Sequence, residues 1–223
     1  MGWRVSYISK LRRYRDLSSF LVKRPFVAFP VDEDPYFDGE STPMFLALLG
    51  ASRFYLEYGS GSSTIAAARM GKRFICVETD KYFLATVRKK IGGLKAGQTL
   101  VHADIGLTGP WGAPLRAKSR WAGRLKKWRA YPERAWTLIG VGEPPDLVLV
   151  DGRFRVATAL TCLAHLAGHP GATVLVDDYI DRPWYHVLEQ YADLVEIRGR
   201  MAVFHPRAQA PVAAIAEYAA DWR

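Results

Sequence analysis

The sequence is poor in cysteine and in long apolar runs. Its 223 residues include two cysteines, Cys76 and Cys162, each inside an apolar stretch, which excludes a disulfide scaffold and gives no support to a metal site of paired thiolates. No apolar run approaches the roughly 18 residues that a membrane span requires, and charges interrupt the N-terminal region where a signal peptide needs an unbroken apolar stretch. We therefore expect a cytoplasmic protein.

Acidic residues are also scarce, with 22 Asp and Glu against 31 Lys and Arg, and the excess of positive charge is local. Residues 1–24 and 116–134 carry net charges of +6 and +7, so the rest of the chain sums to −4. A local basic segment says more about a partner than the overall charge does. Nucleic acid stays open as a partner, although no RNA-binding module is recognisable.

The N-terminal unit, residues 1–43, is predicted to be a basic amphipathic helix followed by a linker rich in proline and acid. Apolar residues recur at steps of three or four between residues 3 and 24, with Arg and Lys on the other faces. Such a helix would lie on an anionic membrane surface as a peripheral attachment, contact a partner or the second subunit of a homodimer, or pack against its own domain.

Residues 44–207 are predicted to form one α/β domain, followed by a C-terminal helix within 208–223. The predicted strands are residues 53–58, 73–78, 99–103, 146–151 and 172–177, and the predicted helices are residues 43–50, 63–70, 81–91, 156–167 and 183–191. Uniformly apolar strands alternating with helices predict a doubly wound sandwich with a mostly parallel sheet. Residues 194–198 and 201–205 are joined too closely for a crossover and predict an antiparallel hairpin. Residues 105–143, rich in Trp, Gly, Pro and Arg, predict an insertion or lid at the active site.

The stretch "FYLEYGSGSST", residues 54–64, predicts a strand that ends in a glycine-rich loop. Gly59 and Gly61 permit a tight turn and a close approach of the backbone to a ligand. Glu78 ends the next strand, where a carboxylate accepts hydrogen bonds from ribose hydroxyls. A dinucleotide fingerprint has the same elements, but Thr64 stands where its third glycine belongs, which weakens that interpretation. The alternative is that the glycines only form turns and the acids only cap helices.

The motifs "LEYGSGSST", "VETD", "HADIG" and "PDLVLVDG" together resemble the successive motifs of class I S-adenosylmethionine-dependent methyltransferases. The resemblance covers residues 54–204, and "DIGLTGPWG", "DLVLVDGRFR" and "DDY" are similar to small bacterial methyltransferase-like proteins of unassigned substrate. It implies a Rossmann-like, seven-stranded sheet with six parallel strands and one antiparallel strand in the terminal hairpin.

The same resemblance implies roles for individual residues. Glu57, Gly59, Gly61 and Ser62 would line the methionine and ribose side of S-adenosylmethionine; Glu78 would hold the ribose hydroxyls; Thr79 and Asp80 would flank the adenine; Asp104 would stand near its amino group; and Asp151 would face the methyl group.

Three aspartates at the ends of two predicted strands form a second candidate site. Asp151, Asp177 and Asp178 are similar to the metal ligands of cation-dependent O-methyltransferases, and three carboxylates would suit Mg²⁺ or Mn²⁺. The sequence departs from that group, because Asp178 replaces its usual Asn and Phe154 replaces the lysine of catechol-type enzymes. The alternative is that Asp177 or Asp178 caps the helix that begins near residue 182.

Without a metal, the candidates for a general base are Asp151, Asp178 and His186. Arg153 and Arg155 either clamp an anionic substrate or pair with the neighbouring carboxylates.

The leading hypothesis is an S-adenosylmethionine-dependent methyltransferase that acts on a hydroxyl group of a small molecule or glycan. The alternatives are an RNA or protein methyltransferase, a NAD(P)-binding oxidoreductase, and a catalytically silent binding protein on the same fold.

Overall fold

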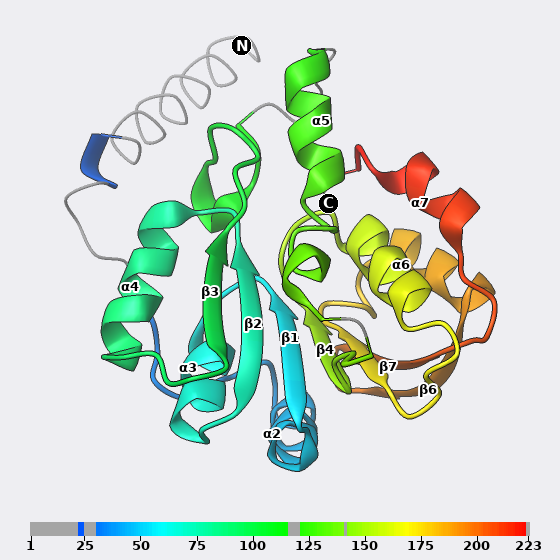
Figure 1. Cartoon of the computed structure of the whole chain (residues 1–223), viewed down its shortest axis with the longest axis horizontal. Helices are drawn as coiled ribbons and strands as arrows, with labels where there is room; N and C mark the ends of the chain where they lie inside the picture. The colour runs from blue at the N-terminus through cyan, green and yellow to red at the C-terminus, as the bar shows by residue number, and fades with distance from the viewer. Residues whose placement is uncertain (1–21, 25–29, 116–120, 141, 222–223) are drawn as a thin grey trace, which may run out of the picture.

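The computed structural model describes residues 22–24, 30–115, 121–140 and 142–221, which form a seven-stranded sheet between two layers of helices (Figure 1). The strands are β1 (Phe54–Tyr58), β2 (Arg73–Glu78), β3 (Gln98–His102), β4 (Leu147–Val150), β5 (Thr173–Val176), β6 (Ala192–Arg198) and β7 (Met201–Pro206). The α-helices are α2 (Ser41–Ala51), α3 (Ser62–Arg69), α4 (Lys81–Ile91), α5 (Ala122–Ala130), α6 (Arg155–His165) and α7 (Val212–Tyr218). Three 3₁₀ segments are η1 (Pro110–Gly112), η2 (Trp136–Leu138) and η3 (Pro183–Gln190).

The strand order is β3-β2-β1-β4-β5-β7-β6. Strands β1 to β5 pair in parallel, and β7 runs antiparallel to both β5 and β6. This confirms the predicted doubly wound sandwich, its mostly parallel sheet and its antiparallel terminal hairpin. The order reverses direction between β1 and β4, so the carboxyl ends of these two strands form the edge where such sheets bind ligands.

Alternating residues of the strands fill two cores, one on each face of the sheet. Helices α2, α3 and α4 cover one face, and α6, α7 and part of the insertion cover the other. Strands β4 and β5 are buried almost throughout, which explains why "LVLV" and "TVLV" show no polar alternation.

The predicted elements agree with the observed ones to within a few residues, with one difference in type. Residues 183–191 were predicted to be helical, and they form η3, a 3₁₀ segment that begins at Pro183, rather than an α-helix. Pro183 does not explain the difference, because proline is tolerated at the first position of a helix, where the N–H has no partner within the helix.

The insertion packs into the core around α5. Trp128 and Tyr131 are each 1% exposed and belong to the same core as β1 and β4, whereas Trp111 and Trp121 are largely exposed. That the insertion forms a lid over the cofactor remains a prediction.

Most of the predicted basic helix, residues 3–24, lies outside the described residues. Its membrane, homodimer and partner roles stay predictions. In the part of the chain that the structure describes, no helix combines the length and the apolar character needed to cross a bilayer.

Candidate functional site

Two glycines bring the carboxyl ends of β1 and β4 into contact. Gly59 has a φ of +97°, and a Cβ atom there would lie 2.8 Å from the backbone nitrogen of Gly152. A Cβ atom on Gly152 would lie 2.4 Å from the Tyr131 hydroxyl oxygen and 3.0 Å from the backbone nitrogen of Gly59. Real Cβ atoms do not tolerate such distances, so both positions require glycine for this close approach.

Glu57 is linked to the glycine-rich loop through hydrogen bonds to α3. It is fully buried on β1, and its carboxylate accepts hydrogen bonds from the hydroxyl groups of Ser63 and Thr64, the latter at 2.6 Å. The Thr64 hydroxyl oxygen also accepts a hydrogen bond from the Gly61 backbone N–H at 3.0 Å. Thr64 therefore links the buried carboxylate to the loop, a role that the sequence interpretation missed.

Burial raises the pKa of Glu57 to about 7, against the opposing effect of the two hydroxyl hydrogen bonds. The carboxylate is enclosed by Ser63 and Thr64 of α3, and its predicted contact with the cofactor stays a prediction.

The backbone at Gly61 borders open space. Its φ of 175° is an extended conformation, and an added Cβ atom would meet nothing within 4 Å. Ser62 follows, half-buried, as the first residue of α3. The loop therefore offers free room directly above a helix N-terminus, where backbone N–H groups favour anionic or polar ligand groups.

Glu78 lies at the end of β2, next to this loop. Its carboxylate accepts hydrogen bonds from the backbone N–H groups of Ser60 (2.8 Å), Thr79 (2.7 Å) and Asp80 (2.8 Å), and from the Ser60 hydroxyl (3.0 Å). The Thr79 hydroxyl also donates to this carboxylate, at 3.2 Å, and a ribose hydroxyl can replace either hydroxyl bond without disturbing the backbone. Together with the open space at Gly61, this arrangement fits the adenosine moiety of S-adenosylmethionine.

Thr79 and Asp80 are buried beside Glu78 and are tied to the insertion and to the N-terminal segment. The Thr79 hydroxyl donates to the carbonyl oxygen of Gly112 at 3.1 Å. Asp80 caps α4 and pairs with the buried guanidinium of Arg24, which also donates to the Thr108 carbonyl at 2.7 Å. Asp80 thus acts as a cap and an ion-pair partner in this structure, and its predicted contact with adenine stays a prediction.

Asp104 follows β3 and is largely exposed. It accepts a hydrogen bond from the Gly106 backbone N–H at 2.8 Å and pairs with Lys127 of α5 at 2.5 Å. The bond from Lys127 lowers the pKa of Asp104, so its carboxylate stays charged near neutral pH.

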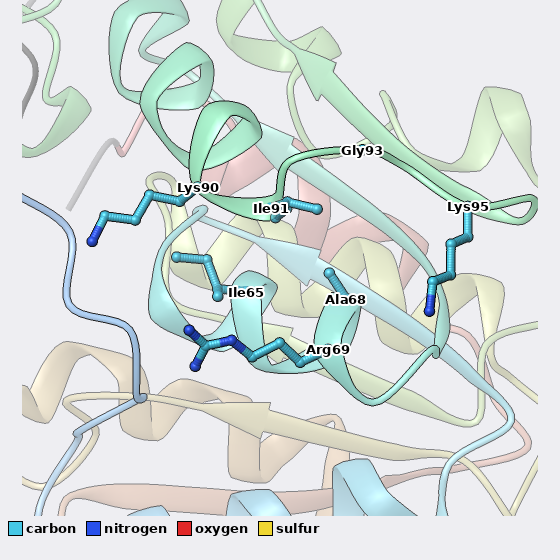
Figure 2. Close-up of a pocket in the computed structure, with 7 residues that line it drawn as sticks. All are labelled: Ile65, Ala68, Arg69, Lys90, Ile91, Gly93 and Lys95. Atoms are coloured by element: carbon cyan, nitrogen blue, oxygen red, sulfur yellow. The ribbon is translucent and has the colours of Figure 1, made fainter.

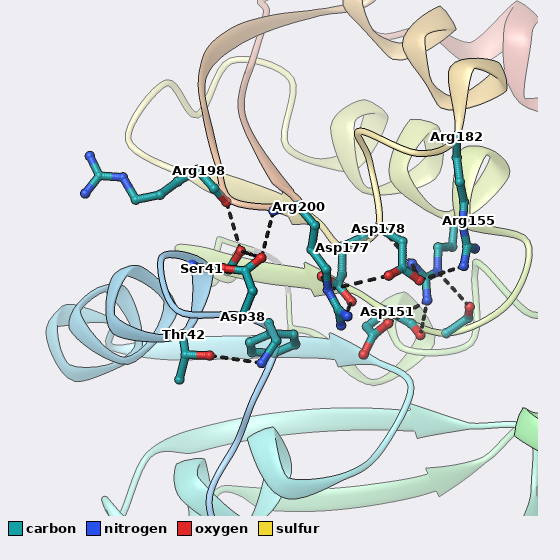
Figure 3. Close-up of polar contacts among 12 residues, drawn as sticks. Asp38, Ser41, Thr42, Asp151, Arg155, Asp177, Asp178, Arg182, Arg198 and Arg200 are labelled. Carbon is teal, nitrogen blue, oxygen red and sulfur yellow. Dashed lines mark hydrogen bonds and ion pairs between the residues drawn. The ribbon is translucent and has the colours of Figure 1, made fainter.

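Asp151, Asp177 and Asp178 converge as predicted, but three arginines surround them (Figure 3). One oxygen from each aspartate lies within 4.8 Å of the others. Arg200 binds the fully buried Asp177 carboxylate with two parallel bonds of 2.8 and 2.7 Å.

Arg155 connects the ends of β4 and β5. It donates to the side chains of Asp151 (2.5 Å) and Asp178 (3.0 Å) and to the backbone carbonyls of Asp151, Gly152 and Asp177. These five bonds match the five N–H donors of a guanidinium. Of the two alternatives for Arg155, the structure places it as the partner of the carboxylates.

The aspartate cluster does not fit a divalent cation. Asp178 is bound by Arg182 at 2.7 Å as well as by Arg155, so each of the three carboxylates has a guanidinium partner. Three positive charges balance the three negative ones, and a Mg²⁺ or Mn²⁺ ion would have to displace arginines from strong charge-assisted bonds.

Asp151 is the candidate base with the most suitable surroundings. Its side chain is 34% exposed at the strand end. Desolvation raises its pKa and the negative charges of Asp177 and Asp178 add to this effect, whereas Arg155 opposes it. Asp178 is bound by two arginines, and the exposed His186 stacks on the ring of Tyr179 with centroids 4.8 Å apart.

Backbone strain gathers at the same edge of the sheet. Among the described residues, Trp111, Phe154 and Asp178 combine a side chain with a φ between 53° and 60°. They belong to the loops that follow β3, β4 and β5. Strained backbone of this kind is held in place by surrounding structure and is common at functional sites.

A cavity of about 200 Å³ lies at a different place, between the carboxyl ends of α3 and α4 (Figure 2). It is lined by Ile65, Ala68, Arg69, Lys90, Ile91, Gly93 and Lys95. Because α3 and α4 run back from the carboxyl edge of the sheet, their carboxyl ends lie toward the opposite edge. The cavity includes none of the predicted site residues.

No protein-family model and no curated protein matches the chain. Among solved structures, a methyltransferase-like protein from Silicibacter pomeroyi is 29% identical, with a TM-score of 0.67 over 81% of this chain and 93% of that one.

Two further matches are the S-adenosylhomocysteine-bound methyltransferase PaMTH1 from Podospora anserina and the N-methyltransferase NodS from Bradyrhizobium japonicum, in complex with S-adenosylhomocysteine. PaMTH1 has 13% identity and a TM-score of 0.45 over 74% of this chain and 76% of that one. NodS has 12% identity and a TM-score of 0.43 over 85% of this chain and 97% of that one.

The sheet order, the terminal hairpin and the strand-end acids agree with the likeness to the Silicibacter protein. The chain has the class I S-adenosylmethionine-dependent methyltransferase fold, and over most of its length it is similar to a methyltransferase-like protein.

Proposed function

We propose that the protein transfers the methyl group of S-adenosylmethionine to a hydroxyl group of a small molecule or glycan. The observation that carries the proposal is the placement of Asp151, a partly exposed carboxylate with a raised pKa, directly beside the glycine contact of β1 and β4. A base at this point faces the loop that offers room for the cofactor.

The cofactor would be held by residues from three strand ends. Gly59, Gly61 and Ser62 form the loop around its methionine side, and Glu78 receives the ribose hydroxyls. The remaining residues, Thr79, Asp80 and Asp104, surround the adenine side, with Arg24 and Lys127 holding the two aspartates in place. Glu57 contributes indirectly, because its hydrogen bond from Thr64 fixes the glycine-rich loop at Gly61.

When bound, S-adenosylmethionine supplies an electrophilic methyl group on a positively charged sulfur. Asp151 would accept the proton of the acceptor hydroxyl, and the cofactor would supply the methyl group that takes its place on the oxygen, its sulfur keeping the electron pair of the former carbon–sulfur bond. A raised pKa suits this role, because a base works best when its pKa lies near the working pH. Arg155 fixes the carboxylate through Oδ1.

The first test is calorimetric titration with S-adenosylhomocysteine, NAD and NADP. We expect micromolar binding of S-adenosylhomocysteine only, with at least a tenfold loss in Glu78→Ala. Glu196→Ala is a matched control, because Glu196 is an exposed carboxylate of the hairpin paired with Arg198. Preferential binding of NAD or NADP would replace the proposal with an oxidoreductase, and equal loss in both variants would show that the effect is not specific to Glu78.

The role of Asp151 needs a separate test with methyl transfer to a panel of hydroxyl compounds as the readout. We expect Asp151→Asn to lower kcat by at least a hundredfold, the usual range for general-base catalysis, and to leave the affinity for S-adenosylhomocysteine unchanged. A variant with full kcat would show that another group takes the proton.

A further inference from the structure

Two buried polar atoms at the contact of β1 and β4 have no hydrogen-bond partner. Among the described residues, five buried side-chain polar atoms are unpaired, and the Tyr131 hydroxyl and the Arg153 Nε are two of them. The Tyr131 hydroxyl lies against Gly152, next to Arg153 in the chain. Because a buried polar group without a hydrogen-bond partner is destabilising, these two atoms at the ligand-binding edge indicate a missing partner.

Tyr131 is held rigidly in this position. Its ring packs against Tyr58 and Phe154 with centroid distances of 5.6 Å to each, and Tyr58 donates a hydrogen bond to the carbonyl of Pro132. The Arg153 backbone N–H is close enough to lower the pKa of the phenol, an effect that burial outweighs. An N–H group is itself a donor and cannot accept the hydroxyl proton. That proton therefore has no acceptor among the described residues.

Arg153 also differs from the other arginines of the site in its charge balance. Arg155, Arg182 and Arg200 each pair with aspartates. Within the described part of the chain, Arg153 takes part in no ion pair. Burial and the charge of Arg155 lower its pKa, while Tyr131 and Asp151 act in the opposite direction. The guanidinium is therefore a partly buried cation that lacks a counter-ion.

We propose that Arg153 and the Tyr131 hydroxyl bind a carboxylate or phosphate group of the methyl acceptor. Both can donate hydrogen bonds to an anionic oxygen, and the bonds of a guanidinium to such groups are among the strongest in proteins. Arg153 stands two residues after Asp151, the proposed base, whereas the methionine tail of the cofactor is expected at Gly59, Gly61 and Ser62. The inference rests on the proposed function and narrows its acceptors to anionic hydroxyl compounds.

The test uses inorganic phosphate and acetate as probes, titrated into the full chain saturated with S-adenosylhomocysteine. We expect at least one of the two anions to bind, with a loss of tenfold or more in Arg153→Gln and of about three- to tenfold in Tyr131→Phe. Tyr131→Phe keeps the aromatic packing. Arg207→Gln is the control for binding to exposed positive charge, because Arg207 pairs with Asp193 on the surface. Arg153→Lys, which keeps the charge, is expected to restore part of the affinity.

A second measurement identifies the source of the anion. Methylthioadenosine lacks the amino-acid tail of S-adenosylhomocysteine, so the ratio of the two affinities reports on contacts to that tail. We expect the same ratio in the wild-type protein and in Arg153→Gln. A ratio that collapses in the variant would assign the subsite to the cofactor carboxylate and overturn the acceptor assignment.

The absence of anion binding to the wild-type protein, or equal binding in all variants, would overturn the subsite itself. The proposed function fails separately, if S-adenosylhomocysteine does not bind the wild-type protein.

Discussion

The buried carboxylate of Glu57 predicts an unusual dependence of stability on pH. Burial raises its pKa from the ordinary 4.5 to about 7. Below pH 4.5 the carboxyl group is protonated in both the folded and the unfolded chain, and between the two values only the unfolded chain releases the proton. The contribution of Glu57 to the free energy of unfolding is therefore fully present below the lower value and is lost as the pH rises through about 7.

The size of the effect follows from the two pKa values. Each pKa unit corresponds to about 1.4 kcal/mol, so the full difference amounts to about 3 kcal/mol. Glu57→Gln keeps the shape of the side chain and an oxygen that accepts from Ser63 or Thr64, but it removes the titration. We expect the variant to gain about 2 to 3 kcal/mol relative to the wild-type protein between about pH 5 and pH 8.

The assay is urea denaturation of both proteins at several pH values in that range. Other titrating groups contribute almost equally to both proteins. The difference between the two curves of unfolding free energy against pH therefore isolates Glu57. Parallel curves would refute the reasoning, because they would show that the carboxylate ionises inside the protein as easily as in the unfolded chain.

Four further predictions concern the site. Gly59→Ala should lower the melting temperature and cost about 2 to 4 kcal/mol, because it combines a positive φ with a Cβ atom 2.8 Å from Gly152. Gly61→Ala has room for its Cβ atom, so it should keep the melting temperature but weaken S-adenosylhomocysteine binding. A lower melting temperature with unchanged binding would place the ligand elsewhere. Arg24→Ala should cost about 3 kcal/mol in urea denaturation, because it leaves Asp80 buried without its counter-charge, and an unchanged midpoint would contradict that. Calorimetry should detect no Mg²⁺ or Mn²⁺ binding below millimolar concentration, and micromolar binding would show that the cation displaces the arginines.

The sequence was sufficient to predict the sheet and the edge at which its acidic residues gather. Uniformly apolar strands leave few alternatives to a parallel sheet with helices on both faces, and the carboxyl ends of parallel strands meet at one edge. Glu78, Asp151 and Asp177 each end or directly follow a strand, so their common location depends only on correct strand assignments.

The partners of these residues could not be predicted in the same way. Arg200 reaches Asp177 from the turn between β6 and β7, and Arg24 reaches Asp80 from the N-terminal segment. Such pairs depend on tertiary packing between distant parts of the chain, for which a single sequence carries no periodic signal. The site of Tyr131 depends likewise on how the insertion folds back onto Gly152.

Phe154 shows how the insertion and the chemistry of the site are connected. In catechol-type enzymes a lysine base stands at this position, whereas here the residue is fully buried, adopts a strained φ of 53°, and packs against Trp128 and Tyr131 of the insertion. The position anchors the insertion and cannot also supply a base. The arginines likewise neutralise the aspartates that would otherwise attract a cation. Because neither a lysine nor a metal is available at this edge, we propose that the partly exposed Asp151 removes the acceptor proton. Arg153, which pairs with no carboxylate among the described residues, is then the cation that we propose binds an anionic acceptor.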